Sequence, residues 1–165
     1  MKKSSTLSWF GQDQLKQAQI YLADVPGMPH SAELNHFALD LAVWAAKSIF
    51  NIYERDAAKA EGRKPIRFCD SAEHSRQCHQ QGQITTNEAT LMTACRAILQ
   101  HSVSPLLPHC ANPLGYAFGL AEWAALNVNN TMRGWYERHD PEANPVHLIW
   151  EHMKRSAINK KGGAQ

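Results

Sequence analysis

The stretch that decides the fold reads Leu39-Asp40-Leu41-Ala42-Val43-Trp44-Ala45-Ala46-Lys47-Ser48-Ile49-Phe50-Asn51-Ile52-Tyr53-Glu54-Arg55-Asp56. From just before it, apolar side chains recur at steps of three and four residues, which is the period of one face of an α-helix. The stripe consists of Leu34, Phe37, Leu41, Trp44, Ala45, Ser48 and Ile52. We therefore predict one long helix that ends near Asp56 and is capped at its start by the hydroxyl of Ser31.

The first half of this stretch has an echo later in the chain. Residues 37–46 and 116–125 share an aromatic residue, then Leu-Ala, then Trp-Ala-Ala. A duplicated helical unit would explain the echo, and so would two buried helices that converged on closely packing residues. On either explanation the two helices are the expected central packing pair, with Trp44 and Trp123 in the core. Trp44→Ala would then cost about 3–5 kcal/mol.

Start and stop signals predict further helices. Thr85 with Glu88 three residues later is a capping box, and Asn112-Pro113 has the order of a cap followed by a first-turn proline. No segment alternates convincingly with the period of a strand. The additional helices are expected over about residues 11–23, 66–80, 85–99, 113–137 and 145–157. The predicted fold is all-α, a single-domain bundle of five to seven helices over residues 1–165, with 1–8 and 159–165 as frayed tails.

Composition favours a folded protein in the cytoplasm. Apolar residues make up 44% of the chain and charged residues 19%, which argues against disorder. The formal charge of +2 is too small to imply a polyanionic partner by itself. No apolar run reaches the roughly 18 residues of a membrane span, and the N-terminus lacks the apolar core of a signal peptide. Four cysteines without a dense spacing pattern indicate reduced thiols and a cytoplasmic location.

One cluster of residues has the side chains that zinc prefers. Cys69, His74, Cys78 and His79 offer four thiol or imidazole ligands, the number that a tetrahedral zinc site takes. Their spacing matches no common zinc knuckle or finger, so a polar helix with buried thiols and exposed histidines is the competing interpretation. Glu33 and His36 form a Glu-x-x-His pair like half of a carboxylate di-metal site, but a second such pair is missing.

No residue set predicts an enzyme. A nucleophilic Ser or Cys needs a base within reach and a third group that orients the base. His109-Cys110 and Cys78-His79 are sequence neighbours, which does not bring their side chains together. A glycine-rich phosphate loop is also absent from the sequence. We therefore predict a non-enzymatic protein without a required cofactor.

The last third of the chain gathers basic and aromatic residues. Aromatic and arginine side chains are enriched at the centres of protein interfaces, so this region is the predicted partner-binding surface. Aromatic residues among cations can also hold a nucleic-acid strand, which makes a nucleic-acid-binding accessory protein the alternative. The candidate residues are Arg133, Trp135, Tyr136, Arg138, Trp150, Lys154 and Arg155.

Several packing motifs occur in an order that resembles a family of small helical proteins described as putative bacterial immunity proteins. The similar segments are Leu41-Ala42-Val43-Trp44-Ala45-Ala46, Tyr53-Glu54, Arg63-Lys64-Pro65-Ile66, Gly82-Gln83-Ile84 with Glu88-Ala89, and Leu114-Gly115-Tyr116-Ala117. The chain departs from the family in having fewer alanines and two cysteines in its polar helix. The resemblance implies a protein that binds and neutralises, or otherwise modulates, a partner protein, and it carries over no catalytic residues.

Overall fold

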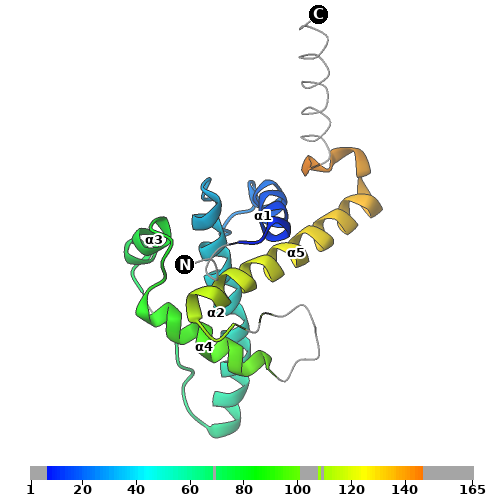
Figure 1. Ribbon diagram of the computed structural model, residues 1–165. Coiled ribbons are helices and arrows are strands. Elements are labelled where there is room, and N and C mark those ends of the chain that lie inside the picture. The colour runs from blue at the N-terminus through cyan, green and yellow to red at the C-terminus, as the bar shows by residue number, and fades with distance from the viewer. Residues whose placement is uncertain (1–6, 69, 101–107, 109, 147–165) are drawn as a thin grey trace, which may run out of the picture.

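The computed structural model describes residues 7–68, 70–100, 108 and 110–146, and this part of the chain is helical without any strand (Figure 1). Its elements are α1 (Trp9–Leu22), α2 (Leu34–Glu61), α3 (Ala72–Gln80), α4 (Thr86–Leu99), α5 (Pro113–His139) and the short 3-10 helix η2 (Pro141–Ala143). The predicted all-α bundle is confirmed.

Helices α2 and α5 are the centre of this bundle. They pack against each other, and each also packs against α1 and α4, whereas α3 packs on α2 (Figure 1). Both helices bury alanines between larger apolar residues in the shared core, and small side chains allow close approach of helices. The largest fully buried apolar side chains are Leu15, Phe37, Leu39, Leu41, Leu91, Met92, Tyr116 and Leu120. The predicted central pair is therefore present, whichever origin the internal echo has.

Of the caps predicted for α2, α4 and α5, the last two are present. The capping box of Thr85 and Glu88 is complete, because each side chain accepts from the backbone N–H of the other residue. The side chain of Asn112 accepts from the backbone at the start of α5. The prediction for Ser31 is wrong, since Glu33 caps α2 by accepting from the backbone N–H of His36 at 2.5 Å. The hydroxyl of Ser31 instead donates a hydrogen bond to the carboxylate of Asp40.

The connection between α2 and α3 differs from the prediction. Helix α2 continues past Asp56 to Glu61. Its cap residue, Gly62, has a φ of +68°, a left-handed conformation that glycine adopts without strain. The third helix was expected from residue 66, but α3 begins only after Ser71, which caps it. The backbone N–H of Ile66 donates to the side chain of Glu54 at 2.6 Å, and this bond holds the preceding segment against α2 in a non-helical conformation.

Trp44 is not a core residue, and this corrects the prediction. Its side chain is 41% exposed, while Trp123 in α5 is half-buried. The core face of α2 includes the buried side chains of Phe37, Leu41 and Phe50. The tryptophan lies beside this face, on a stripe that lines a cleft. Ile52, also assigned to the buried face, is 58% exposed. The apolar stripe read from the sequence was therefore too wide by one row of residues.

Because of this exposure, Trp44→Ala is expected to lower the free energy of unfolding by only about 1 kcal/mol. Phe37 on the same helix has no exposed surface and is the matched control. Phe37→Ala should cost about 3–5 kcal/mol, because it leaves a cavity in the core. Urea denaturation of both variants, followed by circular dichroism, measures the difference. Equal losses would show that Trp44 is a core residue after all.

The C-terminal part of the prediction lies mostly outside the described residues. Asn144 accepts from the backbone N–H of Val146 at 3.0 Å, as expected for the start of the predicted last helix. Trp150, Lys154 and Arg155 belong to residues 147–165, which the structure does not describe. None of the described helices is both long and apolar enough to cross a membrane.

Candidate functional site

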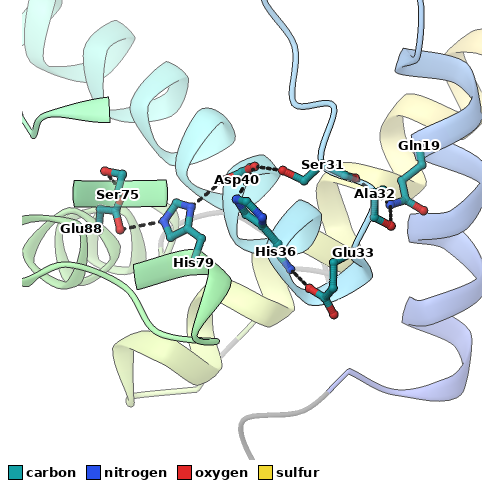
Figure 2. Close-up of polar contacts among 9 residues, drawn as sticks. All are labelled: Gln19, Ser31, Ala32, Glu33, His36, Asp40, Ser75, His79 and Glu88. Atoms are coloured by element: carbon teal, nitrogen blue, oxygen red, sulfur yellow. Dashed lines mark hydrogen bonds and ion pairs between the residues drawn. The ribbon is translucent and has the colours of Figure 1, made fainter. Parts of the chain in front are cut away.

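A polar cleft of about 570 Å³ lies beside the N-terminal half of α2. Helix α3 forms the other wall, and the segment before α2 closes one side. The residues that line it include Ser31, His36, Asp40, Trp44, His79 and Glu88. Figure 2 shows that the rings of His36 and His79 both point toward the carboxylate of Asp40. Ionisable side chains from three helices therefore meet in one accessible hollow.

His79 is the buried centre of this cluster, with only 3% of its surface exposed. Its Nδ1 lies 2.6 Å from Oδ1 of Asp40 in α2, and its Nε2 lies 2.9 Å from Oε1 of Glu88 in α4 (Figure 2). A carboxylate oxygen can only accept, so both ring nitrogens carry protons and the imidazole is a cation. One positive charge from α3 thus joins two helices that bear negative charges.

The pKa values of these groups follow from their contacts. Burial opposes the charge on His79, but hydrogen bonds to Asp40 and Glu88 outweigh burial and raise the pKa of His79 from 6.5 to about 9. Burial would raise the pKa of Glu88, yet the hydrogen bonds from His79 and from the backbone of Thr85 lower it below its usual value. The pKa of Asp40 is lowered for similar reasons, against the effect of burial, by hydrogen bonds from His79 and Ser31.

The two serines of the cluster hold carboxylates. Ser31 Oγ donates to Oδ2 of Asp40 at 2.6 Å, and Ser75 Oγ donates to Oε2 of Glu88 at 2.9 Å. Neither hydroxyl donates to an imidazole, which a serine nucleophile activated by a histidine base would do. The arrangement orients the two carboxylates around His79 and does not form a nucleophilic triad.

His36 completes the cluster on the open side. Its Nε2 lies 3.4 Å from Oδ2 of Asp40, one helical turn away on α2, and its ring meets the ring of His79 edge to face at 6.2 Å. One ligand atom from each of His36, Asp40 and His79 lies within 4.8 Å of the other two. Two imidazoles and a carboxylate at this separation are a donor set that a divalent transition-metal ion accepts.

A second hollow, of about 540 Å³, continues along the same side of α2. Its wall is the segment after α2, which is fixed by a buried carboxylate. Glu54 accepts from both terminal nitrogens of Arg63, at 2.6 and 3.0 Å, and these bonds together with the backbone N–H of Ile66 lower the pKa of Glu54 to about 2. Lys47 lines both hollows, so they adjoin along one side of α2.

We call these two adjoining hollows the α2 groove. Its floor is a row of α2 residues at helical spacing, namely His36, Asp40, Trp44, Lys47, Asn51 and Arg55. The half near Arg55 is cationic and apolar, since Arg67, Ile52 and Ile66 line it and the carboxylate of Glu54 is neutralised by Arg63. The other half holds the histidine and carboxylate cluster.

Comparison with known protein families, with curated proteins and with solved structures finds no match to this chain.

Three of the four residues of the predicted zinc cluster belong to the described part of the chain. Cys69 lies outside the described residues. His74 is exposed, and Cys78 is a half-buried free thiol on α3. His79 points away from them toward Asp40 and Glu88. Of the predicted ligands, His79 alone belongs to the three-residue group that the described part of the chain brings together.

The described part of the predicted partner surface lies at the end of α5. Trp135 is 47% exposed and packs against Tyr136 and His139, with ring centres 5.0 and 4.7 Å away. Tyr136 stacks on Tyr21 of α1 at 6.2 Å, so part of its aromatic surface is used within the fold. Arg138 is exposed on the last turn. No contact of the described residues tests whether this sequence-predicted surface binds a partner, and it stands as the competitor of the α2 groove.

Arg133 is exposed close to the same region and donates to the side chain of Asn130. Glu137 separates Arg133 from Arg138 along the helix, and together with Arg133 it lines a third hollow. Charges of both signs therefore alternate here, and the nucleic-acid alternative also remains a prediction.

The contact between His36 and Asp40 was not predicted. The Glu-x-x-His pattern pairs His36 with Glu33 at a spacing of three, although Glu33 serves as the helix cap. The spacing of four between His36 and Asp40 places both on one face of a helix and was the available signal. The contribution of Glu88 was hidden because the capping box already explained that residue.

Proposed function

We propose that this protein binds and modulates a partner protein, in the manner of an immunity protein, and that it does so without enzymatic activity. The observation that carries the proposal is the α2 groove, in which Trp44 and Ile52 stay substantially exposed on the helix that organises the fold. Exposed aromatic and aliphatic residues beside cations are typical of the centre of a protein interface. The free thiols of Cys78, Cys95 and Cys110 support a cytoplasmic site of action.

The charge and the exposed apolar side chains of the groove indicate which class of polypeptide segment it binds. Lys47, Arg55 and Arg67 supply positive charge around Ile52 and Ile66, and the two isoleucines are each 58% exposed. The Glu54 carboxylate inside this half accepts from Arg63 and therefore repels an anion little. An acidic polypeptide segment that carries an apolar side chain fits such a surface. We assign this class of segment as the occupant of the groove.

The test is capture of a binding protein from the native host, followed by measurement of its affinity for purified variants. Lys47→Glu and Ile52→Asp should each weaken binding by about 30-fold or more, as substitutions at the centre of an interface do. Binding should also weaken with added salt, because the cationic half of the groove attracts an acidic segment. Isothermal titration calorimetry at two salt concentrations measures both effects.

The control is the double variant Trp135→Ala and Arg138→Ala at the end of α5, which should bind with wild-type affinity. If this variant loses binding while the groove variants keep it, the contact lies on the C-terminal surface and the groove assignment is wrong. Recovery of nucleic acid, with binding abolished by nuclease, would contradict the protein partner and favour the nucleic-acid alternative. Failure to retain any specific protein would also contradict the proposal.

A further inference from the structure

The cluster in the polar half of the α2 groove has the donors and the spacing of a metal site. The Nε2 of His36 lies 3.4 Å from Oδ2 of Asp40, and the Nδ1 of His79 lies 2.6 Å from Oδ1 of the same carboxylate. In a tetrahedral zinc site with bonds of about 2.0–2.1 Å, neighbouring ligand atoms are about 3.4 Å apart. The distance from His36 to Oδ2 of Asp40 already has this value, while His79 lies closer to the other oxygen. One ligand atom from each of the three residues lies within 4.8 Å of the other two, so small side-chain shifts bring all three to bonding distance of one ion.

We propose that His36 Nε2, the Asp40 carboxylate and His79 Nδ1 bind one zinc-like divalent transition-metal ion in the cleft. Two imidazoles and one carboxylate are a set of intermediate softness, which suits zinc and its neighbours better than calcium or magnesium. Three protein ligands leave the fourth tetrahedral position for water or for a group of another molecule. This set shares only His79 with the cluster predicted from the sequence, and His36 and Asp40 take the place of its other three residues.

The residues around the three ligands are arranged as metal sites require. When Nδ1 of His79 binds an ion, its proton leaves to solvent, and Nε2–H continues to donate to Glu88 across 2.9 Å. A carboxylate on the far nitrogen fixes the ring orientation and raises the basicity of the ligand nitrogen. Ser31 in turn donates to Asp40 and holds that carboxylate in place. Both outer contacts exist before an ion arrives.

Access to the site comes from the cleft. The side chains of His36 and Asp40 are 13% and 24% exposed, whereas His79 is buried. An ion can therefore enter between the two accessible ligands and reach Nδ1 of His79 without disturbing the core. Since the site needs only residues of α2 and α3, with α4 supplying the outer carboxylate, it does not depend on the proposed partner protein.

The test uses the full-length chain, without a histidine tag and stripped of metal, titrated with Zn²⁺ in a calorimeter. One ion per chain is expected. Asp40→Asn and His36→Ala should each weaken Zn²⁺ binding by at least about 10-fold. His36 lies outside the buried contact between His79 and Glu88, so its variant remains informative even if Asp40→Asn disturbs the fold. Circular dichroism at equal concentration checks the helical content of each variant.

The matched controls are His74→Ala and Cys78→Ser, two residues of the cluster predicted from the sequence. Both variants should bind Zn²⁺ as the wild type does. Co²⁺ substituted for Zn²⁺ should show visible bands of a tetrahedral ion without a sulfur-to-cobalt charge-transfer band. The proposal is overturned if the wild type binds no Zn²⁺. It is equally overturned if the control variants lose binding while Asp40→Asn and His36→Ala retain it.

Discussion

Replacement of His79 by leucine is expected to lower the free energy of unfolding by about 3–5 kcal/mol. The imidazolium is buried between Asp40 and Glu88, and Glu88 is itself only 2% exposed. Leucine fills a similar volume but leaves two carboxylates without their shared partner. An unpaired buried charge is costly, because water no longer solvates it and no cation replaces the water.

Urea denaturation in a metal-free buffer with a chelator measures this loss. The control is His74→Leu, an exposed position on the same helix, which should change the free energy of unfolding by less than about 0.5 kcal/mol. Adding Glu88→Gln to the His79→Leu background should recover part of the stability, because one unpaired charge is removed. A loss for His79→Leu no larger than that of the control would mean that the ion pairs contribute nothing to the fold.

The second large effect is a loss of stability at alkaline pH. The pKa of His79 is raised from 6.5 to about 9 in the folded chain, so its protonated form stabilises the fold fully below about pH 6.5. As the pH rises from 6.5 to 9 the contribution is lost, and the shift corresponds to about 3 kcal/mol. The groups that face this imidazole are Asp40, Glu88 and His36.

The acid side of the profile has the opposite sign. The pKa values of Asp40 and Glu88 are lowered, so their contribution is present above the values of the unfolded chain and is lost as the pH falls below them. Acid and alkaline pH both break the contacts of His79 with the two carboxylates. The stability lost at acid pH and the stability lost at alkaline pH therefore come from the same ion pairs, and the two values are not summed. Urea denaturation with a chelator present, repeated from acid to alkaline pH, should give a maximum in the free energy of unfolding between about pH 5 and 6.5.

The His79→Leu variant is the control for this profile, since it lacks the titrating group. Its stability should stay nearly constant over the range in which the wild type weakens. A wild-type profile that is flat between pH 6.5 and 9 would show that the pKa of His79 is not raised in the folded chain.

The fold was readable from the sequence because its signals are local. The capping box at Thr85 and the Asn112-Pro113 start both lie where the structure begins α4 and α5. The three- and four-residue period of α2 predicted the long helix itself. What failed was the width of its buried face, since a period of 3.6 residues does not say where the apolar stripe ends. Trp44 and Ile52 lie just beyond that edge and are exposed for this reason.

The candidate site was harder to predict because its residues come from three helices. Asp40 and His79 are 39 positions apart, and no local pattern relates them. The sequence did single out His79, but grouped it with its neighbours on α3 because proximity along the chain was the only available guide. Glu88 was recognised for its local role in the capping box, and its second contact depends on how α3 packs beside α4. Such contacts follow from tertiary packing.

Helix α3 has one buried residue, and that residue is His79. A nine-residue helix of polar sequence is unstable alone, and this one gains almost no apolar area from the bundle. Ion pairs of His79 therefore hold α3 against the bundle, whereas apolar packing holds the other helices. Local opening of α3 should accordingly need less free energy than global unfolding, and amide hydrogen exchange within it should respond to pH separately from the rest of the bundle. Helix α3, which forms one wall of the cleft, can then detach while α2 and α5 remain folded.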